Sequence, residues 1–164
     1  MGLFLSEGPV KKELPASLIK ARAYAFLLLK FRPRSEKELY ERLKKKNFGE
    51  GVTKNTISFL KEKKFIDDED FARAWIDWRL KRPLGLRRIE QELRQKGIDK
   101  EIIRAQIEVS RKDYREEDIV LKLAQERLGK LKDLQQKKAK QRILSYLLRR
   151  GFSTEIVIDT LNQL

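Results

Sequence analysis

The feature that most constrains the fold of this chain is an internal repeat with a period of about 50 residues. Three apolar residues recur with the same spacing at three places in the sequence. They are Leu39, Leu43 and Phe48, then Ile89, Leu93 and Ile98, and finally Ile143, Leu147 and Phe152. Apolar residues three to four positions apart favour helices, and similarity at a fixed period of this size is typical of helical repeat arrays. The sequence therefore predicts an all-α protein made of three tandem repeats.

The residues that end each repeated helix support this interpretation. Asn47, Gly97 and Gly151 occupy one repeat position, just before the last apolar residue of the pattern. A helix commonly ends on a residue with positive φ, which glycine adopts freely and asparagine tolerates. Asp99 and Ser153 follow directly and are good N-caps for the next helix. Each copy is thus expected to contain a second helix, a tight turn and a third helix.

A capping-box sequence marks the start of the second helix in the first repeat. Ser35 and Glu38 have the spacing at which each side chain caps the other residue's backbone amide. Gly85 stands at the matching position of the second repeat and is a weaker N-cap. First helices are expected at residues 18–31, 69–81 and 117–134, the last one longer because no proline follows it.

These elements divide the chain into a flexible N-terminal leader and three three-helix units. The expected boundaries are 1–17 for the leader, then 18–66, 67–115 and 116–164. A bundle of about 50 residues is marginal by itself, so neighbouring units are expected to share apolar faces.

Composition indicates a binding protein and argues against several enzyme classes. The 164 residues include 39 Lys and Arg against 25 Asp and Glu, a net charge of +14, and a polyanionic partner explains this excess. There is no cysteine and no histidine, which removes thiolate metal sites, disulfides and the commonest general base. No apolar run approaches the roughly 20 residues that span a membrane. We expect a cytoplasmic, monomeric protein with no cofactor, no metal and no catalytic residue.

The acidic cluster at 67–70 is the strongest alternative to a binding function. Asp67, Asp68, Glu69 and Asp70 precede an apolar run, as residues 116–118 do before Ile119. Carboxylates at this position cap free amides and complement the helix dipole, which is the favoured interpretation. A Mg²⁺ site, or a metal-dependent nuclease using the first three residues, remains an alternative.

The aromatic residues of the second repeat also allow two interpretations. Phe71, Trp75 and Trp78 are spaced three and four apart, which is ordinary core spacing and the favoured interpretation. Aromatic residues beside basic ones are also the platform on which single-stranded bases stack. Trp78, which adjoins Arg79 and Lys81, fits this alternative best.

Basic residues recur at equivalent places in the three repeats, beside the turn prolines and at the ends of the second helices. We expect them to form a basic stripe that binds DNA without sequence specificity, or a nucleoprotein filament. The candidate residues are Arg32, Arg34, Lys44, Lys45 and Lys46 in the first repeat; Arg79, Lys81, Arg82, Arg87, Arg88, Arg94 and Lys96 in the second; and Lys137, Lys138, Lys140, Arg142, Arg149 and Arg150 in the third. Charges at helix C-termini also complement the helix dipole, but that accounts for only one or two of them per helix.

Three segments together resemble the RecX family of regulatory proteins. The first runs from Arg32-Pro33-Arg34-Ser35 through Leu39, Leu43 and Phe48; the second is residues 65–72, Phe-Ile-Asp-Asp-Glu-Asp-Phe-Ala; the third runs from Gly85-Leu86-Arg87-Arg88-Ile89 through Leu93, Lys96, Gly97 and Ile98. The resemblance is specific over residues 21–107 and looser from there to residue 164. Asn47 and Leu86 depart from the pattern, where the family usually has glycine, and proline or alanine.

The resemblance implies more than the residues show. It implies an elongated, curved array of three-helix repeats that binds the RecA recombinase in the helical groove of its filament on DNA. It implies inhibition of the ATPase, strand-exchange and coprotease activities of RecA, and hence a role in DNA repair, homologous recombination and the SOS response. Binding of the protein alone to single- and double-stranded DNA is implied too. A general helical DNA-binding module without a recombinase target remains the alternative.

Overall fold

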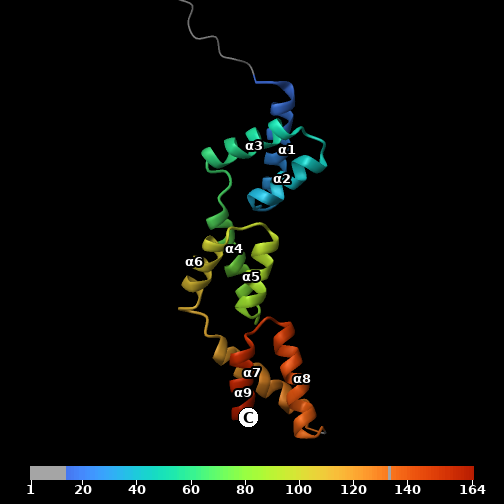
Figure 1. Cartoon of the computed structure of the whole chain (residues 1–164), viewed down its shortest axis with the longest axis vertical. Helices are drawn as coiled ribbons and strands as arrows, with labels where there is room; N and C mark the ends of the chain where they lie inside the picture. The colour runs from blue at the N-terminus through green and yellow to red at the C-terminus, as the bar shows by residue number, and fades with distance from the viewer. Residues whose placement is uncertain (1–13, 133) are drawn as a thin grey trace, which may run out of the picture.

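The computed structural model describes residues 14–132 and 134–164, and this part of the chain folds into nine helices without a strand. The helices are α1 (Ala16–Phe31), α2 (Glu36–Lys45), α3 (Glu50–Glu62), α4 (Asp68–Leu80), α5 (Leu86–Gln95), α6 (Lys100–Ser110), α7 (Glu116–Gly129), α8 (Gln136–Arg149) and α9 (Thr154–Gln163). They form three bundles, α1–α3, α4–α6 and α7–α9, which follow one another along an elongated, gently curved molecule (Figure 1). The predicted all-α repeat architecture is confirmed. Residues 1–13 of the predicted leader lie outside the described part of the chain.

Each repeat has a separate apolar core. The repeated pattern supplies the centre of each one, with Leu39 and Leu43, then Ile89 and Leu93, then Ile143 and Leu147 all buried. The buried apolar residues fall into three clusters, one per bundle, and the larger helix–helix contacts all lie within a bundle. The expectation that neighbouring repeats share apolar faces was therefore wrong. The repeats are instead joined by hydrogen bonds at the ends of helices.

The predicted helix ends are confirmed. Asn47, Gly97 and Gly151 have φ angles of 64°, 80° and 86°. The hydroxyl of Ser35 accepts a hydrogen bond from the amide of Glu38, which completes the capping box. The side chains of Asp99 and Ser153 cap α6 and α9.

The third repeat differs from its predicted layout. Helix α7 ends at Gly129 instead of continuing to residue 134, because glycine is a poor helix former and Leu131 turns back to pack against the core of the repeat. Residues 136–138 form the first turn of α8. As a result α8 has 14 residues, whereas α2 and α5 have 10 each.

The prediction that Phe71, Trp75 and Trp78 belong to the core of the second repeat is confirmed only in part. Phe71 is buried, and Trp75 is half-buried against the core. Trp78, however, is 51% exposed, and its ring lies against Trp75 at a centroid distance of 5.1 Å. The spacing placed all three on one helix face, but Trp78 lies at the edge of that face.

Two of the hydrogen bonds between the first and second repeats lie at the N-terminus of α2. The hydroxyl of Ser35 donates to the backbone carbonyl of Lys96 at 2.7 Å. The backbone amide of Glu36 donates to the carboxylate of Asp68 at 2.9 Å. Asp68 at the start of α4 thus helps to cap the N-terminus of α2, and the end of α5 is hydrogen-bonded to Ser35 beside it.

The same joint occurs between the second and third repeats. The backbone amide of Gly85 donates to the carbonyl of Arg150, and that of Leu86 to the carboxylate of Glu116, both at 2.9 Å. Gly85 is needed for this approach, since a Cβ there would lie 2.0 Å from the carbonyl of Gly151. Beside the joint and within the second repeat, the hydroxyl of Tyr114 donates to the carbonyl of Leu84 at 2.8 Å.

The acidic clusters at 67–70 and 116–118 were predicted to cap the helices that follow them, and this prediction is only partly right. Asp67 does cap its own helix, accepting from the amides of Glu69 and Asp70. Asp68 and Glu116 instead cap a helix of the preceding repeat. Among the described residues, no three or more acidic side chains are arranged to hold a metal ion. None of the described helices combines the length and the apolar character that a membrane span requires.

Candidate nucleic-acid and protein interface

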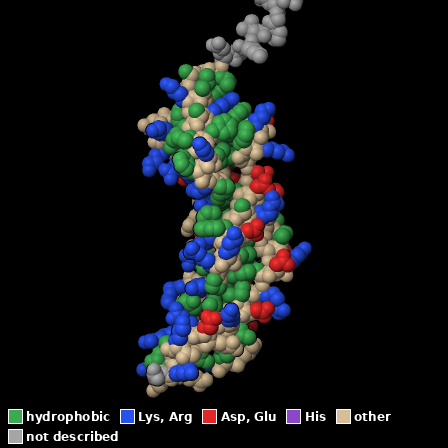
Figure 2. Space-filling view, turned by 180° about the vertical axis from the view of Figure 1, so that it is seen from behind, with side chains coloured by type: hydrophobic (Ala, Val, Ile, Leu, Met, Phe, Trp, Pro, Cys, Tyr) green, Lys and Arg blue, Asp and Glu red, His purple; other side chains and the backbone are tan. Residues whose placement is uncertain are grey.

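Basic side chains are concentrated along one long edge of the molecule. In Figure 2, Lys and Arg side chains follow the left edge, which is the side of the second helices, α2, α5 and α8. Most of the Asp and Glu side chains in this view lie toward the opposite edge. The side that carries the second helices therefore presents the excess positive charge.

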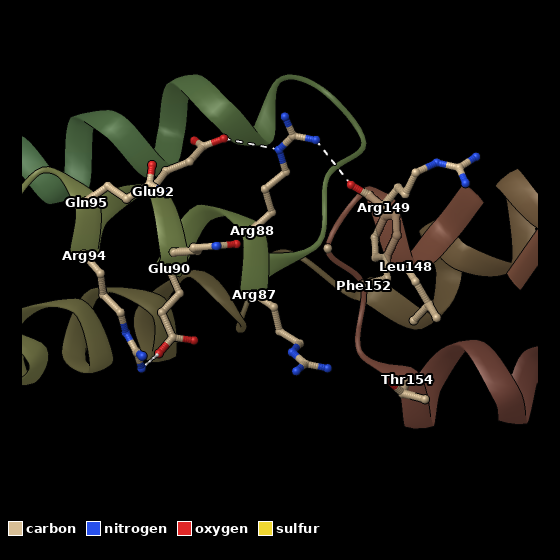
Figure 3. A pocket seen from close by; sticks show the side chains of 12 residues that line it. Arg87, Arg88, Glu90, Glu92, Arg94, Gln95, Leu148, Arg149, Phe152 and Thr154 are labelled. Carbon is tan, nitrogen blue, oxygen red and sulfur yellow. Dashed lines mark hydrogen bonds and ion pairs between the residues drawn. The ribbon is translucent and has the colours of Figure 1, made fainter. Parts of the chain in front are cut away.

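A groove crosses this edge between the second and third repeats (Figure 3). It has a volume of about 900 Å³ and lies between α5 and the segment that joins α8 to α9. Arg87, Arg88, Arg94 and Arg149 all line it, so the structure brings together four of the predicted residues from two repeats. The groove follows from the joint, because the contact of Gly85 with Arg150 holds α5 beside the end of α8.

The arginines of the groove have different roles. Arg88 is held between the carboxylate of Glu92 and the backbone carbonyl of Arg149, each at 3.3 Å, and so belongs to the joint. Arg94 forms an ion pair with Glu90 one helical turn away. Arg87 is exposed, extends into the space between α5 and α9 and forms no ion pair with a described residue (Figure 3). Its charge is available to a ligand in the groove.

Two predicted site residues are largely committed to internal ion pairs. Lys96 forms an ion pair with Glu38 of the first repeat at 2.9 Å and lies 4.0 Å from the centroid of the Trp75 ring. Arg79 is 12% exposed at its side chain and pairs with Glu92 at 2.5 Å. Burial by itself would raise the pKa of Glu38, but the hydrogen bonds from Arg32 and Lys96 outweigh it and lower the pKa to about 2.

Three more predicted residues donate to backbone carbonyls. They are Arg34 to Leu28, Lys140 to Leu161 and Arg150 to Pro83. These three side chains are half-buried, and their contacts secure turns and helix ends. Sequence reasoning counted them as surface charge because spacing alone does not show which carbonyls lie within reach.

The other predicted residues are exposed, and most of them form no ion pair with a described residue. Arg32 and Lys44 do form ion pairs, with Glu38 and Glu50. The residues without such a pair are Lys45, Lys46, Lys81, Arg82, Arg87, Lys137, Lys138, Arg142 and Arg149. They are distributed over the end of α2, the turn after α4, the groove, and the start of α8. The predicted stripe is therefore a series of separate basic patches.

Sequence reasoning missed the role of Asp68 and Glu116 in joining the repeats. Burial raises the pKa of both carboxyls above the ordinary value, although each accepts a backbone hydrogen bond that acts in the opposite direction. A signal was present, since each is a carboxylate at the start of a first helix, and the two stand 32 and 30 residues after the helix N-termini that they cap.

The fold and this surface define the class of the molecule: it is a tandem array of three-helix repeats with a basic edge. Three family models match it in order, described as the first, second and third three-helix domains of RecX, over residues 21–60, 67–105 and 115–161. The chain belongs to the RecX family.

Individual relatives agree with this assignment. The chain is 34% identical to Regulatory protein RecX of Mycolicibacterium vanbaalenii, covering 85% of this chain and 79% of that protein. It is 29% identical to the protein of the same name from Clostridium botulinum, covering 90% and 69%. The crystal structure of RecX from Lactobacillus salivarius superposes with a TM-score of 0.81 at 22% identity, covering 92% of this chain and 98% of that one. At 22% identity, the similarity to this crystal structure supports the fold alone.

Proposed function

We propose that this protein binds RecA recombinase filaments on DNA, lodges in their helical groove and reduces the activities of RecA. The observation that carries this proposal is the match of all three repeats, in order, to the three domains of a family whose members are named regulatory proteins. The protein acts by occupying a surface, without catalysis of its own.

The basic edge suits such a partner. A filament on DNA presents phosphates at regular intervals along a helical path, and an elongated array with several basic patches can follow that path. Separate patches, each on its own repeat, contact phosphates without reading base edges, so binding to DNA alone is expected to be independent of sequence.

Sedimentation with preformed filaments tests the proposal. The protein is mixed with RecA filaments on single-stranded DNA and, in parallel, with the same amount of bare DNA. We expect it to sediment with the filaments in excess of what the DNA alone retains. Equal retention on both would favour the alternative of a DNA-binding module without a recombinase target.

A pair of charge variants locates the surface. Arg87→Glu changes an exposed side chain of the groove, and Lys122→Glu makes the same charge change on the exposed surface of α7. We expect the first to weaken filament binding and the second to leave it within about twofold, because Arg87 lines the groove and Lys122 does not. If the two variants weaken filament binding equally, the filament does not contact the protein at the groove.

A further inference from the structure

Three phenylalanines form an exposed aromatic cluster on the first repeat, apart from the groove. Phe26 belongs to α1, Phe59 to α3, and Phe65 follows α3. The rings of Phe26 and Phe65 lie nearly perpendicular with centroids 4.9 Å apart, and Phe59 lies 6.5 Å from Phe26. Phe65 is 52% exposed and Phe26 38% exposed. Large aromatic rings at this exposure leave apolar surface in water that a partner can cover.

The repeat architecture does not require this cluster. One period of about 50 residues later, Phe26 and Phe59 correspond to Ile76 and Val109, and the aromatic residues of that repeat, Phe71, Trp75 and Trp78, stand at other positions of α4. The connection after α6 does contain an aromatic residue, Tyr114, but its hydroxyl turns inward to bond Leu84. The second repeat therefore folds without aromatic residues at the positions of Phe26 and Phe59, and the repeat architecture does not account for these rings in the first.

Positive charge accompanies the cluster. The guanidinium of Arg22 lies over Phe59, 3.7 Å from the ring centroid, and donates to the side chain of Asn55. It forms no ion pair with a described residue, and its buried Nε has no acceptor among them. Lys63 and Lys64 precede Phe65 directly, and among the described residues Lys63 forms an ion pair with Glu62 alone, an exposed contact of 3.6 Å.

Lys64 adds a separate observation, because its backbone is strained. Its φ is 55°, in the left-handed region that glycine adopts at the ends of two other helices, α5 and α8, at Gly97 and Gly151. A residue with a Cβ costs free energy in this conformation, and glycine does not. A lysine at a position that suits glycine, beside the most exposed ring of the cluster, indicates a use for its charge.

We infer that this cluster is a stacking platform for the unpaired bases of a single-stranded nucleic acid, with Lys63 and Lys64 contacting its phosphates. Aromatic rings beside basic side chains bind single strands because every base presents a π-face and every nucleotide carries a negative charge. A site for duplex DNA needs no exposed ring, since paired bases are already stacked on one another. The platform does not depend on a recombinase target, so it stands or fails separately from the filament proposal.

The decisive experiment compares single strands with duplex for two phenylalanine variants. Fluorescence anisotropy measures the Kd of the full chain for labelled oligothymidylate and for a duplex of the same length. Phe65→Ala is expected to weaken oligothymidylate binding about 5- to 150-fold, the range found for loss of one stacked base, and to change duplex binding less than about twofold. Phe31→Ala is the matched control, because Phe31 is 76% exposed on the same repeat but outside the cluster; it should change neither Kd.

Two further variants separate stacking from folding. Phe65→Trp keeps a ring and should bind oligothymidylate at least as tightly as the unaltered chain. Lys64→Gly relieves the backbone strain, so its unfolding temperature should be unchanged or higher while its affinity for oligothymidylate falls. The inference is overturned if Phe65→Ala binds oligothymidylate normally, or if it weakens single-strand and duplex binding equally. It is also overturned if this variant loses only filament binding, which would make the cluster a protein-docking surface.

Discussion

The carboxylate of Glu116 accepts a hydrogen bond from the backbone amide of Leu86 at 2.9 Å, across the boundary between the second and third repeats. Asp68 accepts in the same way from Glu36 across the preceding boundary. The array is therefore held together by one repeated joint, in which a carboxylate of one repeat caps a helix of the repeat before it. The position of the basic groove depends on this joint.

Removal of the capping carboxylate should weaken the joint. In Glu116→Ala the buried amide of Leu86 loses its acceptor, and an unsatisfied buried donor costs about 1–3 kcal/mol. Urea unfolding measures this loss. Glu117→Ala is the matched control, since the neighbouring side chain is exposed and should change stability by less than about 0.5 kcal/mol. Equal stabilities of the two variants would contradict the joint.

The buried joint carboxyls should also make stability depend on pH. The pKa of Glu116 is raised in the folded state, chiefly by burial, so the folded chain binds more protons than the unfolded chain between the two pKa values. The contribution of this group to stability is thus full below its ordinary pKa of 4.5 and declines as pH rises through the raised pKa. When urea unfolding is measured at increasing pH from about 4.5 upward, the unaltered chain should lose stability relative to Glu116→Gln. A constant difference would contradict this assignment.

Glu38 should show the opposite pH dependence. Its pKa is lowered to about 2 because hydrogen bonds from Arg32 and Lys96 outweigh its burial, so its contribution is present above 4.5 and is lost as pH falls toward 2. Glu38→Gln should therefore be less stable than the unaltered chain at neutral pH, with the difference shrinking as the solution is acidified. A difference that grows in acid would refute the ion pair.

At the joint between the second and third repeats, the backbones of Gly85 and Gly151 approach so closely that a side chain added at Gly85 should clash. Gly85→Ala places a Cβ 2.0 Å from the backbone of Gly151, and relieving that overlap should cost about 1–3 kcal/mol or separate the repeats. Gly49→Ala is the control, because Gly49 is also an N-cap residue with negative φ and nothing lies within 4 Å of its Cβ position. Thermal unfolding distinguishes them; a tolerated Gly85→Ala would show that the repeats do not meet as described.

The repeat period allowed most of the fold to be predicted, because each copy must bury the same apolar positions. Leu93 is fully buried as the pattern predicts, and Gly97 and Gly151 end helices with positive φ. The end of α7 was misjudged because Gly129 is a weak stop signal without a proline, and the packing of Leu131 decides it.

The candidate site was less predictable than the fold. Composition identified a basic surface, but which charges are available depends on contacts between residues far apart in sequence. Lys96 and Arg88 are used in ion pairs and joints, whereas Arg87, next to Arg88 in the chain, is exposed to the groove. The partners of Asp68 and Glu116 lie in the preceding repeat, which local capping rules do not consider.

The most direct test of the central claim is the rate of ATP hydrolysis by RecA on single-stranded DNA with this protein added below the concentration of RecA. If the array occupies the filament groove, the rate should fall in proportion to the protein bound, and Arg87→Glu should inhibit less than Lys122→Glu. An unchanged rate and an unchanged filament length at saturating protein would contradict the account.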